Sequence, residues 1–263
     1  MTMSKSLRTL AAAALAATAF ATAASAQDTG ATGQPGRANN VVLVHGAFAD
    51  GSGWRGVYDV LTAKGYRVSV VQNPLTSFAD DVAATRRVLE RQDGPTILVG
   101  HSYGGTVITE TGTHPKVAGL VYVAAFAPDV GQSTGDQLAE IPPPPEFIIE
   151  PQADGFGFIN GPMFKAGFAG DTSDADAAFL RDSQVPIAME SFGAKVTQAA
   201  WRTKPSWFVV ATEDGAIDPK LLRATAERIG AATYEIEGSH VVFLTQPEAV
   251  ADVIDRAARS AGQ

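Results

Sequence analysis

The chain has 263 residues, no cysteine, and 28 acidic against 20 basic residues, which gives a formal net charge of −8. A surface of this sign repels polyanions, so neither nucleic acid nor an anionic membrane is an expected partner. The lack of cysteine excludes disulfides and thiolate-bound zinc or iron–sulfur clusters.

The first 26 residues have the pattern of a cleaved secretory signal peptide. Lys5 and Arg8 form a positive start, residues 10–24 are an apolar segment, and Ala24-Ser25-Ala26 supplies the small residues of a cleavage site. At roughly 15 residues, the apolar segment is short for a membrane span. Cleavage after Ala26 would remove two positive and no negative charges, changing the net charge from −8 to −10. We therefore expect an exported protein, periplasmic or secreted, without membrane association after cleavage.

The remainder predicts a flexible leader over residues 27–39 and a single domain over 40–263, a length that one core can serve. Continuous apolar runs predict buried strands at 41–44, 66–71, 96–99, 119–125, 206–211 and 233–236. Apolar residues at helical spacing predict helices at 54–63, 78–89, 103–113, 219–229 and 247–258. This alternation is typical of an α/β fold with a mostly parallel, doubly wound sheet, in which functional groups gather at the carboxyl ends of strands.

Residues 127–203 interrupt the alternation. They contain four consecutive prolines at 142–145, scattered glycines and many phenylalanines. The segment is too long for a plain loop, so we expect an inserted cap with a few helices.

A candidate nucleophile follows the strand at 96–99. Gly100-His101-Ser102-Tyr103-Gly104 matches the Gly-x-Ser-x-Gly pattern of a nucleophile elbow, where a serine sits on a tight turn between a strand and a helix. The same five residues also fit a glycine-rich loop whose serine has no catalytic role, so the remaining residues must decide between the two.

A serine hydroxyl needs a base, and the chain offers four histidines. His101 adjoins the serine and would point away from it, and His114 lies at the far end of the following helix. His45 suits a structural role in the loop after the first strand. His240, just beyond the last strand, is the predicted base.

The imidazole in turn needs a carboxylate on Nδ1. Asp214 lies between Ser102 and His240 in the chain, which gives the Ser–Asp–His order of this elbow motif. Asp129, Glu213 and Asp218 are the alternatives, and Asp218 before Pro219 resembles a helix N-cap.

Two backbone N–H groups are needed to stabilise the oxyanion. The N–H of Tyr103, at the start of the helix after Ser102, is one candidate. The loop after the first strand supplies the other, from Ala47 or from Phe48.

These motifs, His45-Gly46-Ala47-Phe48 with Trp54, the elbow with Gly105, Asp214 and Gly238-Ser239-His240, resemble the α/β-hydrolase superfamily. Within it the chain is most similar to the branch of small esterases that includes plant methylesterases, salicylate-binding protein and hydroxynitrile lyases. The resemblance implies an α/β-hydrolase fold, oxyanion donors Ala47 and Tyr103, no cofactor, and a cap that shapes an apolar pocket.

Two departures argue against a hydroxynitrile lyase. Those enzymes carry a lysine directly after the catalytic histidine and a threonine in the oxyanion loop, where this chain has Val241 and Gly46. An aspartate-nucleophile mechanism is excluded by Ser102.

The expected function is therefore hydrolysis of a small, apolar or aromatic carboxylic ester through an acyl-enzyme on Ser102. The alternatives are a lyase or an oxygenase or haloperoxidase-like enzyme on the same fold, and a receptor-like binding protein with little turnover. The expected partner is a small-molecule ester, and a homodimer is compatible with the sequence.

Overall fold

The computed structural model describes residues 37–261, so the predicted signal peptide and almost all of the predicted leader lie outside the described residues. Within this range the main feature is a parallel sheet with the strand order β2-β1-β3-β4-β8-β9. Its strands are β1 (Asn40–Val44), β2 (Arg67–Val71), β3 (Thr96–His101), β4 (Val117–Val123), β8 (Ser206–Ala211) and β9 (Ala232–Ile236).

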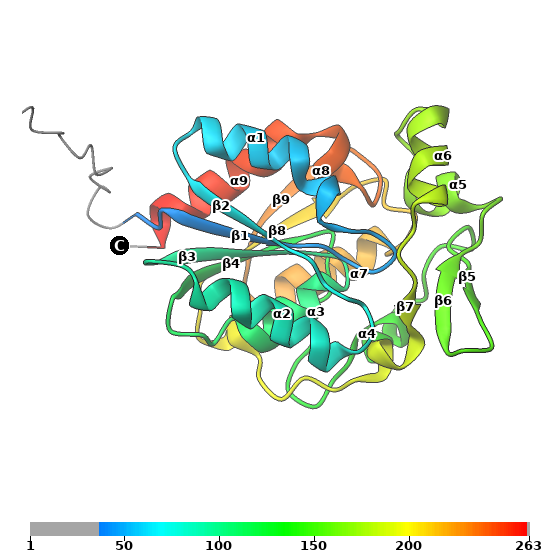
Figure 1. The fold of residues 1–263 in the computed structure, drawn as a ribbon, viewed down its shortest axis with the longest axis horizontal. Coiled ribbons are helices and arrows are strands. Elements are labelled where there is room, and N and C mark those ends of the chain that lie inside the picture. The colour runs from blue at the N-terminus through cyan, green and yellow to red at the C-terminus, as the bar shows by residue number, and fades with distance from the viewer. Residues whose placement is uncertain (1–36, 262–263) are drawn as a thin grey trace, which may run out of the picture. The chain divides into compact units, whose positions relative to one another are not determined.

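Helices cover both faces of this sheet (Figure 1). One face carries α1 (Arg55–Ala63) and α9 (Pro247–Ser260), which pack on each other. The other face carries α2 (Phe78–Glu90), α3 (Gly104–Thr111) and α7 (Pro219–Arg228). This arrangement confirms the predicted doubly wound α/β fold.

The core is concentrated on the central strands. In β1 and β3 every residue is buried, and in β4 and β8 all but one are, whereas the edge strands β2 and β9 are largely half-buried or exposed. The reason is that a central strand of a doubly wound sheet has helices on both faces and strands on both sides. None of the helices within residues 37–261 is long and apolar enough to cross a lipid bilayer.

The chain between β4 and β8 forms the cap. It contains helices, as expected, and also a three-stranded antiparallel sheet with the order β5-β6-β7, which the sequence analysis did not predict. Strands of two to four residues are too short to show an alternating pattern. The cap elements are α4 (Thr134–Glu140), β5 (Ile149–Pro151), β6 (Phe156–Ile159), α5 (Phe164–Phe168), α6 (Asp174–Asp182), β7 (Ile187–Ala188), η2 (Met189–Gly193) and η3 (Ala200–Arg202).

Two short helices flank the carboxyl end of the sheet. The 3₁₀ helix η1 (Gly51–Trp54) follows the loop after β1, and α8 (Val242–Thr245) follows the loop after β9. The two helices contact each other, so the loops that carry His45 and His240 lie close together.

Candidate active site

Ser102 occupies a strained turn between β3 and α3. Its φ of +52° lies in the left-handed region, which a residue with a side chain seldom adopts. A Cβ on Gly100 would come within 2.6 Å of the Gly104 carbonyl oxygen, and one on Gly104 within 2.7 Å of the His45 carbonyl oxygen. The tight turn therefore depends on glycine at both positions, as the elbow motif requires.

His240 is held by Asp214. The His240 Nδ1 atom lies 2.8 Å from Asp214 Oδ2, and both side chains are buried. The other oxygen of Asp214 accepts the backbone N–H groups of Ala216 and Ile217 at 2.8 and 2.9 Å. Because Nδ1 is engaged by the carboxylate, Nε2 is the nitrogen left for a reaction partner.

Ser102 and His240 line one small cavity, together with Ala47. No hydrogen bond joins the Ser102 hydroxyl to His240 among the bonds of residues 37–261, and such contacts often tighten only when substrate is bound. The other walls are apolar: Phe48, Phe126, Leu138, Phe147, Ile149, Phe168, Phe192, Ala216 and Ile217.

The loop after β1 packs directly on the serine. A Cβ on Gly46 would lie 2.7 Å from the Cβ of Ser102. Within the described part of the chain, the backbone N–H groups of Ala47 and Tyr103 donate to no protein acceptor. Free donors therefore lie on both sides of Ser102: Tyr103 follows it, and the loop before it offers Ala47 and also Phe48, whose N–H has no acceptor among the described residues either.

His45 fixes the shape of this loop. Its Nε2 accepts the backbone N–H of Asn73 at 2.9 Å, so Nδ1 carries the proton and donates to the Gly46 carbonyl at 2.8 Å. Burial lowers the pKa of His45, which keeps the ring neutral in this role. His45 is thus engaged with backbone groups.

The other candidate residues lie in different surroundings. Asp129 pairs with Arg202 at 2.6 Å, and Asp218 caps α7 by accepting the N–H of Lys220 at 2.8 Å. Glu213 is exposed, and His114 bonds to a glutamate on α2. Of the four carboxylates considered, Asp214 is the one that contacts His240 within the described residues.

His101 makes a contact that no sequence pattern could have predicted. Its Nε2 lies 3.0 Å from the His240 carbonyl oxygen, and a carbonyl can only accept, so Nε2 carries the proton. Burial, with a smaller effect of neighbouring His240, holds the pKa of His101 well below its usual range. A neutral His101 therefore anchors the backbone of His240 from the elbow side.

Asp171, in the cap between α5 and α6, anchors the same loop from the other side. It accepts the hydroxyl of Ser239 and, at 2.6 Å, the hydroxyl of Thr245 at the end of α8. Burial alone would raise the pKa of Asp171, but these hydrogen bonds outweigh it and hold the pKa below its usual value. The ring of Phe168 on α5 adds a contact, with its centroid 5.0 Å from that of His240.

No group of three or more His, Asp or Glu side chains within residues 37–261 is arranged to hold a metal ion.

Comparisons with known proteins were made on sequence and on structure. A family model described as the alpha/beta hydrolase family matches residues 41–253. A carbendazim hydrolyzing esterase of Nocardioides sp. (strain SG-4G) is 36% identical over 121 residues, covering 40% of this chain and 49% of that relative, so this match spans about half of its length. A pyrethroid hydrolase of Sphingobium wenxiniae is 28% identical over 251 residues, covering 82% of this chain and 86% of the relative.

Two solved structures have a similar fold. A crystal structure of a pyrethroid hydrolase aligns with a TM-score of 0.75 at 22% identity and covers 86% of this chain and 100% of that one. An extracellular alpha/beta-hydrolase from a Paenibacillus species, described as homologous to tobacco salicylic acid binding protein 2, aligns with a TM-score of 0.70 at 21% identity. It covers 84% of this chain and 99% of its own.

Proposed function

Because the chain belongs to the alpha/beta hydrolase family, we propose that it is a carboxylic ester hydrolase in which Ser102 is the nucleophile. The names of its relatives, an esterase and a pyrethroid hydrolase, support ester cleavage. The observation that carries the proposal is that Ser102 faces the same apolar cavity as a histidine whose Nδ1 is bonded to a buried carboxylate.

The mechanism follows from these positions. His240 takes the hydroxyl proton as Ser102 Oγ attacks the ester carbonyl carbon. The N–H groups of Ala47 and Tyr103 stabilise the negative oxygen of the tetrahedral intermediate. Asp214 keeps the imidazole in one tautomer and stabilises its protonated form.

The intermediate collapses when the bond from carbonyl carbon to alcohol oxygen breaks, and His240 donates its proton to the departing alcohol. A water molecule, deprotonated by His240, then attacks the acyl-enzyme and releases the carboxylic acid and free Ser102. His240 returns the proton taken from water to Ser102 Oγ, so the enzyme ends the cycle in its starting protonation state.

The cavity around Ser102 favours a small apolar or aromatic substrate group. Five phenylalanines line it, and Ser102 and His240 are the polar side chains in its lining. Such a surface binds hydrocarbon by excluding water.

A fluorophosphonate label and a short-chain nitrophenyl ester test the proposal. We expect labelling on the peptide that contains Ser102, and a loss of kcat of at least about 10³-fold in Ser102→Ala. Ser206→Ala is a matched control, since its hydroxyl only bonds the Lys204 carbonyl at the start of β8. Labelling of another residue, or full turnover by Ser102→Ala, would contradict the proposal.

A further inference from the structure

A second cavity lies beside the one that contains Ser102 and His240, and we call it the phenylalanine pocket. It is a small cavity with a volume of about 70 Å³. Phe48 and Phe168 line both cavities, so their side chains form the partition between them. The other apolar side chains of the phenylalanine pocket are Phe164, Phe179, Leu180, Val241, Phe243 and Leu244.

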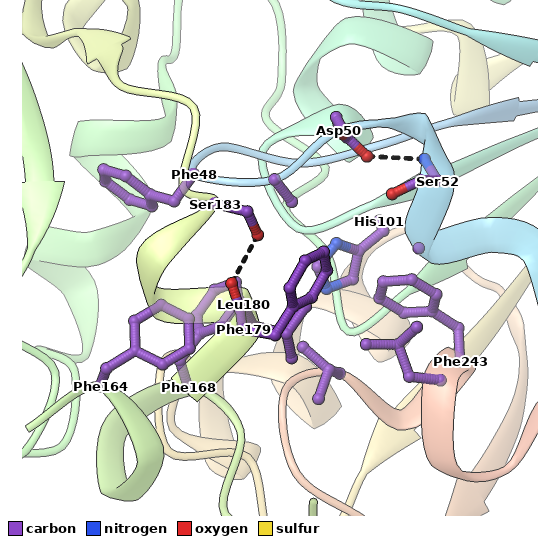
Figure 2. A pocket seen from close by; sticks show the side chains of 14 residues that line it. Phe48, Asp50, Ser52, His101, Phe164, Phe168, Phe179, Leu180, Ser183 and Phe243 are labelled. Carbon is purple, nitrogen blue, oxygen red and sulfur yellow. Dashed lines mark hydrogen bonds between the residues drawn. The ribbon is translucent and has the colours of Figure 1, made fainter. Parts of the chain in front are cut away.

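The cap and the main domain each provide part of this pocket (Figure 2). The cap contributes residues of α5 and α6, and the main domain contributes α8 and the loop after β1. On α6, Phe179 lines the pocket and yet is 68% exposed, which makes it the most exposed of the large apolar side chains described.

Two polar groups in the pocket are already bonded within the protein, whereas the buried Nδ1 of His101, which also lines it, has no hydrogen-bond partner among the described residues. The Ser183 hydroxyl donates to the Phe179 carbonyl at 2.7 Å, and the Asp50 carboxylate accepts the Ser52 N–H at 2.7 Å. The rest of the lining is mostly apolar, so the pocket favours the binding of hydrocarbon over that of hydrogen-bonding groups. The negative charge of Asp50 also disfavours an anionic ligand.

The pocket lies next to the proposed catalytic base, because Phe168 lines it and also lines the cavity that contains His240. Phe168 packs against the ring of His240, which would protonate the alcohol oxygen, and Val241 directly follows His240. The acyl group is attached to the carbonyl carbon that Ser102 attacks, and the cavity around Ser102 is left for it.

We propose that the phenylalanine pocket binds the uncharged, apolar alcohol group of the ester, so that the preferred substrates are esters of aryl-type alcohols. This inference rests on the proposed function. It assigns the two cavities to the two halves of one substrate.

Filling the pocket tests the assignment. Leu180→Trp adds bulk to a half-buried lining position on α6, and Ala175→Trp adds the same bulk to an exposed position on the same helix that lines neither cavity. Two acetate esters, 2-naphthylmethyl acetate and ethyl acetate, differ only in the alcohol. We expect Leu180→Trp to lower the ratio of kcat/KM for the naphthylmethyl ester to that for the ethyl ester about tenfold or more, as loss of most of a buried ring predicts. Ala175→Trp should leave this ratio unchanged.

A second pair of substrates varies the acyl half. Ethyl 2-naphthylacetate and ethyl acetate share the alcohol, and their ratio should respond to Leu180→Trp far less than the alcohol pair. An unchanged alcohol ratio, or a larger change in the acyl ratio, would overturn the assignment.

Phe179→Ala provides a second variant if the tryptophan prevents folding. Its ring is mostly exposed, so the fold should tolerate its removal, and the same alcohol ratio should fall several-fold. An unchanged ratio in this variant would also overturn the assignment. Failure of the proposed function is distinct, because the wild-type protein would then hydrolyse none of these esters and Ser102 would not be labelled.

Discussion

Asp81, beneath the candidate active site, should make the stability of this protein fall as pH rises. Its carboxylate is fully buried and accepts two hydrogen bonds, from the Leu75 N–H at 2.8 Å and from the Tyr103 hydroxyl at 2.9 Å. Burial outweighs these bonds and raises the pKa of Asp81 from 3.8 to about 6.

The sign follows from proton binding. Between pH 3.8 and about 6, folded Asp81 keeps a proton that the unfolded chain has released, so the free energy of unfolding decreases as pH rises through this range. A shift of about 2 pKa units corresponds to about 3 kcal/mol in full. Part of the titration occurs below pH 4, which leaves about 2.5 kcal/mol between pH 4 and pH 7.

Asp81→Asn isolates this contribution. An asparagine has the same shape, can accept from Leu75 and donate to Tyr103, and does not titrate. Urea unfolding, followed by tryptophan fluorescence at several pH values, gives the difference in unfolding free energy between variant and wild type. We expect the unfolding free energy of the variant to rise relative to that of wild type by about 2.5 kcal/mol from pH 4 to pH 7. The other acidic groups titrate alike in both proteins, so their contributions cancel in the difference.

Asp80→Asn is the matched control with the opposite sign. Hydrogen bonds from Ser77, and then from Thr76, lower the pKa of this exposed neighbour, so its stabilising effect is present above pH 3.8 and lost as pH falls. That variant should therefore lose stability relative to wild type as pH rises. A difference for Asp81→Asn that stays constant within about 0.5 kcal/mol from pH 4 to pH 7 would refute the reasoning.

Three further substitutions test the candidate active site by steady-state ester hydrolysis. Asp214→Asn should lower kcat by about 10³-fold or more with little change in KM, because His240 loses the acceptor that fixes its tautomer; a loss below tenfold would contradict this role. Gly46→Ala should lower kcat/KM at least tenfold, since its Cβ would lie 2.7 Å from the nucleophile's Cβ, whereas Gly193→Ala, with open space around it, should not. Asp171→Asn should lower kcat about tenfold at constant KM and change the pH profile of kcat, while an unaltered profile would indicate a merely structural role.

The central strands of the sheet could be predicted from the sequence because they are mostly apolar. The predicted runs at 41–44 and 206–211 match β1 and β8 to within one residue, since a strand buried on both faces tolerates few polar side chains. The cap sheet could not be predicted from the sequence, because strands as short as Ile187–Ala188 have no detectable alternation of apolar and polar residues. The signal peptide stays a prediction.

The candidate active site also contains residues that could be predicted from the sequence and residues that could not. Ser102, Asp214 and His240 could be proposed from motifs, because each lies at the end of a strand and the chemistry limits the residue types. His101 and Asp171 could not, because their bonds to the His240 loop join residues 139 and 68 positions apart. Such contacts depend on how the cap and the elbow pack, which no local pattern encodes.

The support of the His240 loop limits which substitutions could change the substrate range of the proposed enzyme. The loop of His240 is supported by the cap through Asp171 and Phe168, and Phe168 is also part of the partition between the two cavities. A substitution that reshapes the partition for a larger ester would therefore also disturb the support of the proposed catalytic base. Substitutions on α6, at Phe179 or Leu180, avoid that support, because neither residue lines the cavity that contains His240. Substrate range should consequently be easier to alter through α6 than through α5.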